Sequence, residues 1–176
     1  MRPTLAWALG CALALSPGAA LADPPDAPPP RWTVSVDPLT TALGFVHVQV
    51  ERAFGRRVSV YVGPSLRLFD GIQSERHEPY LGLGVEVGVR GFFYGHAPEG
   101  AWVSIRGVAA RVSTSTPAPD ASFGGYVSAL VGYTYLFRRW LVLSGGLGVQ
   151  YLDYRVGAYG TRGVLPAAHT ALGFAF

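Results

Sequence analysis

Apolar side chains recur at every second position along most of this chain, in stretches of about ten residues. The stretch 81–89, for example, alternates Leu or Val with Gly or Glu. A period of two is that of a β-strand, whose successive side chains point to opposite faces. A strand of roughly ten residues, tilted, is long enough to cross a bilayer. The pattern therefore predicts an all-β fold with strands of membrane-spanning length.

Eight such strands are expected, at about 32–37, 39–53, 57–69, 79–93, 101–113, 122–137, 139–152 and 164–176. The stretch 101–113 departs from strict alternation, because Val103 and Val108 have opposite parity. A β-bulge near Arg106-Gly107 would reconcile the two halves of this strand.

The connections alternate between tight and long, as in outer-membrane barrels with short periplasmic turns and longer outer loops. Tight turns are expected at 54–57 and 137–139. Longer polar loops are expected at 70–78, 114–121 and 153–163. Two connections fit this scheme less well, because Asp37-Pro38 is short for an outer loop and 94–100 is long for a periplasmic turn.

Composition separates a membrane barrel from a soluble one. Charged residues make up 14% of the chain, against about 25% in an ordinary soluble domain. A soluble barrel, such as a secreted lipocalin-like binder, turns polar side chains outward, but the outward positions here would carry almost no Asp or Glu. Lipid offers no hydrogen-bond partners for backbone N–H and C=O groups, so the strands must form a closed barrel in which every strand pairs on both sides. We expect an eight-stranded antiparallel transmembrane β-barrel of the outer-membrane type.

The first 22 residues have the three parts of a secretory signal peptide: Arg2, an apolar run that ends at Leu15, and a small-residue site. Cleavage is predicted after Ala22. A lipoprotein reading of Cys11 is the alternative. Residues 23–31 form a proline-rich lead-in, and 32–176 form the barrel. The mature chain would contain no cysteine, which excludes disulfide and thiol chemistry.

Net charge gives no reason to expect a nucleic-acid partner. Removal of Arg2 leaves 13 arginines against 11 acidic residues, and the chain contains no lysine. An excess of about two charges is too small to attract polyanions strongly.

The last strand and the aromatic residues fit a membrane setting. Leu172, Phe174 and Phe176 share one face of a strand that is expected to close the barrel and to be the part read by the barrel-assembly machinery. Aromatic residues gather near the predicted strand ends, as in the two girdles of a membrane barrel. They are Trp32, Phe54, Phe69, Phe92, Phe93, Trp102, Phe123, Phe137, Trp140 and Phe176.

Two segments resemble the opening hairpin of small uncharacterised outer-membrane barrels: Asp37-Pro38-Leu39 and the segment 48–54. More widely, 32–176 resembles the superfamily of the OmpA membrane domain and OmpX. The resemblance implies a barrel fold and a bacterial outer-membrane location, in contact with lipid and lipopolysaccharide. It implies no activity and transfers no catalytic residue.

Four charged residues should point into the bore: Glu51, Arg67, Glu86 and Arg90. Arg106 or Arg111 would join them. An eight-stranded barrel is just wide enough for side chains to fill, and unpaired buried charges are costly. We therefore expect a structural network of paired charges. A narrow ion path and a ligand or catalytic site are the alternatives.

Few residues are of the types that bind metals or act in catalysis. His47 and His169 share the inward parity, but a metal would want a third ligand. Ser144, His169 and Glu86 are the residue types of a lipid-modifying hydrolase, yet no sequence motif places them together. We expect no enzyme activity and no cofactor. The predicted role is structural or one of surface interaction; a narrow passive pore and a lipid-modifying enzyme are the alternatives.

Overall fold

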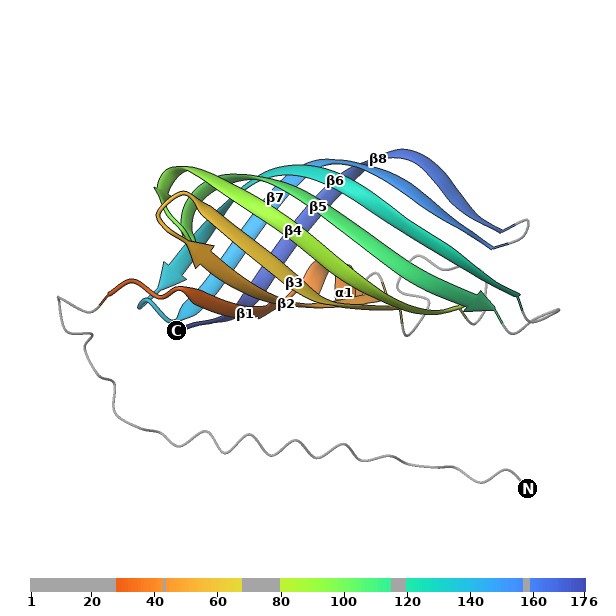
Figure 1. The fold of residues 1–176 in the computed structure, drawn as a ribbon, viewed down its shortest axis with the longest axis horizontal. Helices are drawn as coiled ribbons and strands as arrows, with labels where there is room; N and C mark the ends of the chain where they lie inside the picture. The colour runs from red at the N-terminus through yellow and green to blue at the C-terminus, as the bar shows by residue number, and fades with distance from the viewer. Residues whose placement is uncertain (1–27, 43, 68–79, 115–119, 157–158) are drawn as a thin grey trace, which may run out of the picture.

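The computed structural model describes residues 28–42, 44–67, 80–114, 120–156 and 159–176. They form a closed eight-stranded barrel in which every neighbouring pair is antiparallel and β1 pairs with β8 (Figure 1). This confirms the expected fold. The elements are β1 (Trp32–Val36), α1 (Pro38–Ala42), β2 (Phe45–Phe54), β3 (Val58–Arg67), β4 (Tyr80–His96), β5 (Glu99–Thr114), β6 (Asp120–Phe137), β7 (Leu141–Val156) and β8 (Tyr159–Ala175).

The two ends of the barrel differ. The turns β2–β3, β4–β5 and β6–β7 lie at one end together with β1's first residue and the last residue of the chain; we call it the turn end (Figure 1). The predicted tight turns at 54–57 and 137–139 are confirmed there. At the opposite loop end, all of the predicted loop 70–78 and residues 115–119 of the predicted loop 114–121 lie outside the described residues. The loop predicted at 153–163 is wrong, because β7 continues to Val156 and β8 begins at Tyr159.

The wall has an apolar outer surface and a polar interior. On β4, Leu83, Val85 and Val87 are exposed on the outside, whereas Glu86 and Arg90 are buried. The same division runs along β2, where Val50 is exposed and Glu51 buried. Within the described residues, no helix has the length and apolarity needed to cross a membrane.

The second strand begins later than expected. β1 ends at Val36, and residues 38–42 form α1 instead of the start of a strand. Asp37 accounts for the difference, because its Oδ1 accepts a hydrogen bond from the Thr40 amide and so caps the helix. Pro38 then occupies the first helical position, where no backbone donor is needed. The predicted strand 39–53 is therefore correct only from Phe45 onward.

The β4–β5 hairpin also departs from expectation. The strands continue to His96 and resume at Glu99, so 94–100 is not a long turn. The register shift lies in β4, between Phe92 and Tyr94, and not near Arg106-Gly107. β5 needs no bulge because its inner face changes along the strand from polar (Ser104 and Arg106) to apolar residues. Its outward Val and Ile side chains face the exterior, and Val108, Ala110 and Val112 are buried inside.

The aromatic side chains divide between wall and interior. Trp32, Phe54, Phe137 and Trp140 are exposed near the turn end, as a girdle requires. Phe93, Phe123 and Phe176 are also exposed. Phe92 and Trp102 were expected in a girdle but are buried in the bore, because both have the inward parity. Phe69 lies outside the described residues.

Candidate functional site

Glu51 is the acceptor at the centre of the first of two interior clusters. Arg90 Nη1 on β4 donates to its Oε2 over 2.6 Å. The Ser59 hydroxyl on β3 donates to Oε1, and Thr33 Oγ1 on β1 lies 3.4 Å from Oε2. Three other strands thus place polar groups around one buried carboxylate on β2. This is the arrangement that a buried ion pair needs to offset its loss of hydration.

Arg90 is held by aromatic rings as well as by charge. Its guanidinium carbon lies 4.7 Å from the ring centroid of Tyr61 and 4.8 Å from that of Trp102. Nη2 lies 2.8 Å from His169 Nε2. Because a guanidinium has only donors, Nε2 must accept and the His169 proton must be on Nδ1. That nitrogen lies 3.4 Å from Asp37 Oδ2.

Glu86 organises the second cluster. Its Oε2 lies 2.6 Å from His47 Nδ1, and its Oε1 accepts a hydrogen bond of 2.9 Å from Gln49 Nε2. Arg106 Nη1 lies 3.6 Å from the same Oε1, and Arg106 Nε donates to Ser128 Oγ over 3.2 Å. These groups come from β2, β4, β5 and β6. They therefore join strands on different sides of the bore.

The structure brings together most of the residues that were expected inside. Glu51, Glu86, Arg90 and Arg106 are buried and paired. Arg111 is exposed and does not join them. The side chain of Arg67 lies outside what the structure describes. Sequence reasoning missed Asp37, because it was interpreted as part of a turn.

The possible catalytic residues do not form one constellation. The Ser144 hydroxyl contacts Thr134 Oγ1 at 2.9 Å and the Tyr133 carbonyl at 3.3 Å. His169 faces Arg90 and Asp37 instead, and Glu86 faces His47 and Gln49. His47 and His169 contact different carboxylates. Among the described residues, no group of three His, Cys, Asp or Glu side chains is placed to hold a metal ion.

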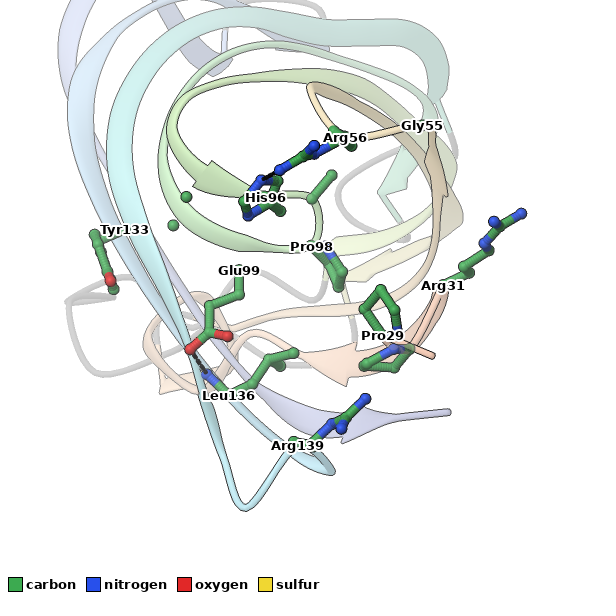
Figure 2. A pocket seen from close by; sticks show the side chains of 14 residues that line it. Pro29, Arg31, Gly55, Arg56, His96, Pro98, Glu99, Tyr133, Leu136 and Arg139 are labelled. Atoms are coloured by element: carbon green, nitrogen blue, oxygen red, sulfur yellow. Dashed lines mark hydrogen bonds between the residues drawn. The ribbon is translucent and has the colours of Figure 1, made fainter. Parts of the chain in front are cut away.

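The turn end of the bore is closed by the β4–β5 hairpin. Ala97 and Pro98 at its tip are buried. The Ala97 amide donates to the Arg56 carbonyl over 3.0 Å, and Glu99 Oε1 accepts from the Leu136 amide over 3.3 Å. A hollow of about 640 Å³ remains outside this tip. Figure 2 shows the side chains that line it. Its lining is mainly apolar, with Arg31 and Arg139 at the edge and Arg56 directed toward His96 (Figure 2).

The last strand closes the wall against β1. Val36 is opposite Leu172, and Val34 is opposite Phe174. The Phe176 amide donates to the Trp32 carbonyl over 2.9 Å, and the Phe176 carbonyl accepts from the Trp32 amide over 3.0 Å. The side chains of Leu172, Phe174 and Phe176 are exposed on the outer surface. Their geometry is that of a barrel-closing strand.

Comparison of the chain with known proteins found no match. No protein-family model matches the chain, and neither a curated protein nor a solved structure matches it.

Proposed function

We propose that this protein is a bacterial outer-membrane β-barrel with a structural or surface-interaction role. The observation that carries the proposal is the inverted distribution of polarity. Large apolar side chains such as Leu83, Ile105 and Leu147 are each more than 60% exposed on the outer wall, whereas Glu86 and Arg106 are at most 2% exposed inside. Water would favour the reverse arrangement, and acyl chains favour this one.

The closed bore favours a structural role over transport. Trp102 is fully buried and packs against both Arg90 and His169, with 5.9 Å between its ring centroid and that of the histidine. The two charge clusters and the hairpin tip at the turn end fill the interior further. A bore filled in this way leaves the outer surface and the loop end as the places where partners bind.

The rest of the proposal concerns export, assembly and the orientation of the barrel in the membrane. The signal peptide is removed after Ala22, in a segment that lies outside the described residues. The barrel-assembly machinery reads the last strand through Leu172, Phe174 and Phe176. The loop end then faces lipopolysaccharide and any partner at the cell surface, and the turn end faces the periplasm.

Heat-modifiable gel migration after detergent extraction tests the membrane setting. A compact species that shifts on boiling is expected, together with flotation of the refolded protein with liposomes. Val87→Arg places a charge in the middle of the outer wall and should reduce insertion, at a cost of about 2–4 kcal/mol. Val87→Leu is the matched control and should insert normally. A purified chain that stays monodisperse in detergent-free buffer would overturn the proposal.

A further inference from the structure

Arginine is concentrated at the turn end. Glu99 is the acidic side chain of these turns among the described residues, and the Leu136 amide already occupies one of its oxygens. The arginines in or beside the turns are Arg31, Arg52, Arg56, Arg57, Arg138 and Arg139. This end of the wall therefore carries an excess of positive charge.

Three of these arginines are engaged with the protein. Arg56 contacts His96 Nε2, Arg57 donates to the Phe92 carbonyl over 3.2 Å, and Arg139 donates to the Pro28 carbonyl over 2.8 Å. They hold the turns together, and their donors are directed at the barrel itself.

Arg138 faces one aromatic ring, that of Phe137, whose centroid lies 5.4 Å from the guanidinium carbon. Arg52 differs from the other arginines because two aromatic rings hold it. Its guanidinium carbon lies 5.0 Å from the Trp32 ring centroid and 5.1 Å from that of Phe54. All three side chains are exposed on the outer wall. Within the described ranges, Arg52 meets no hydrogen-bond acceptor. Stacking fixes the plane of a guanidinium and leaves its N–H edge free for a planar bidentate acceptor such as phosphate.

The wall beside Arg52 fits the rest of an amphipathic ligand. Val60 is directly opposite Arg52 in the β2–β3 ladder, and Val50 is opposite Val62, one step toward the loop end. These three valines are exposed on the same outer face. A charged group at Arg52 would therefore continue into hydrocarbon that lies along the valines.

Two described arginines near the loop end, Arg155 and Arg162, are paired with a carboxylate instead. Arg155 Nε lies 2.9 Å from Asp153 Oδ1, and Arg162 Nε lies 3.5 Å from Asp153 Oδ2. Arg162 Nε also donates to the Tyr151 hydroxyl over 2.6 Å. Their donors are directed at a carboxylate of the protein, whereas those of Arg52 are not.

We propose that Arg52, between Trp32 and Phe54, is the centre of a binding site for the phosphate of an anionic phospholipid. The phosphate accepts from the guanidinium edge, and the acyl chains lie along Val50, Val60 and Val62. This inference rests on the proposed membrane setting and names the lipid class at the turn end.

Lipid binding to the refolded barrel tests the site. The full mature chain in neutral detergent is titrated with short-chain phosphatidylglycerol and with phosphatidylcholine of the same chain length, and retained lipids are measured by native mass spectrometry. Both lipids carry the same phosphodiester, but the choline cation of phosphatidylcholine cancels the net charge of its headgroup and would repel the guanidinium of Arg52. Phosphatidylglycerol should therefore bind about tenfold more tightly. Arg52→Gln should remove this preference, and Trp32→Leu should weaken it.

Arg111→Gln is the matched control, because Arg111 is also exposed but lies on β5 toward the loop end. It should keep the preference. Displacement of phosphatidylglycerol by inorganic phosphate would support recognition of the phosphate itself; failure to displace it would support a site that also needs the acyl chains. Equal binding of both lipids, or the same loss in both variants, would overturn the inference. Heat-modifiable migration of each variant separates such a result from failure of the barrel itself.

Discussion

At the scale of the residue, small side chains in the wall make room for large ones in the bore. An added Cβ at Gly132 would lie 2.5 Å from Trp102 Cζ2, and one at Gly146 would lie 2.6 Å from Trp102 Cη2. An added Cβ at Gly88 would meet the ring of Tyr61. Glycine at these inward positions is therefore required by the aromatic rings that hold Arg90, and at Gly132 also by the Gly145 carbonyl oxygen, which would lie 2.4 Å from the added Cβ. The narrow bore can therefore hold the Trp102 and Tyr61 rings only because these wall positions have no side chain.

Gly132→Ala should destabilise the barrel by about 1–3 kcal/mol, the usual cost of overpacking. The flat ring of Trp102 cannot yield without breaking its hydrogen bond of 2.9 Å to Thr134 Oγ1. Gly145→Ala is the control on the neighbouring strand, because an added Cβ there meets nothing within 4 Å. Urea unfolding in detergent compares the two. A midpoint for Gly132→Ala equal to that of Gly145→Ala would contradict the packing described.

Glu51→Ala should lower the resistance to urea or heat by about 3–5 kcal/mol, because it leaves the buried charge of Arg90 without its carboxylate. Asp153→Ala removes a half-exposed carboxylate from the loop end and should change the midpoint far less. The double variant Glu51→Gln/Arg90→Gln should recover part of the loss, since neither charge is then left alone. An unchanged midpoint in Glu51→Ala would mean that the pair does not stabilise the fold.

At the scale of the element, Asp37 joins β1, α1 and β8 at the point where the first strand ends. Its Oδ1 accepts from the Thr40 amide and from Thr170 Oγ1, and its Oδ2 accepts from the Thr170 amide. The Leu39 amide in turn donates to Thr170 Oγ1 over 3.1 Å. β1 ends at Val36, and the Asp37 carboxylate next to it accepts the hydrogen bonds from β8 that a longer β1 would have made.

Asp37→Ala should loosen this junction, with a loss of about 2–4 kcal/mol for several hydrogen bonds to one charged group. Hydrogen exchange at the Thr170 amide should rise more than exchange in the β5–β6 ladder, which lies elsewhere in the wall. Asp37→Asn keeps one acceptor and should give an intermediate effect. Equal protection of Thr170 in the wild type and in Asp37→Ala would show that the carboxylate does not close the wall.

The sequence predicts the strands of the barrel wall better than the points where strands end and the contacts inside the bore. Alternation located the strands, because a filled interior and a lipid exterior impose opposite polarity on neighbouring residues. The girdle interpretation placed Phe92 and Trp102 outside, although they share the parity of the inward Arg90 and Arg106, because an aromatic ring suits either surface. Alternation did not detect α1, although Asp37 and Pro38 are a helix-start signal, since one turn of helix is too short to give a period. Which residues pair with Glu51 and Glu86 depends on the register between strands. Alternation shows which face a residue is on, but it does not determine the register.

At the scale of the whole molecule, the filled bore predicts an electrically closed barrel. The refolded wild type in a planar bilayer should show no steady conductance steps. Arg90→Ser/Trp102→Ser removes the two largest fully buried side chains of the bore and should give small, stable steps. Ile105→Ala/Leu147→Ala removes apolar volume from the outer wall and should remain silent. Steady steps in the wild type would favour a passive pore, because a path for ions would then exist past the paired charges at Glu51 and Glu86.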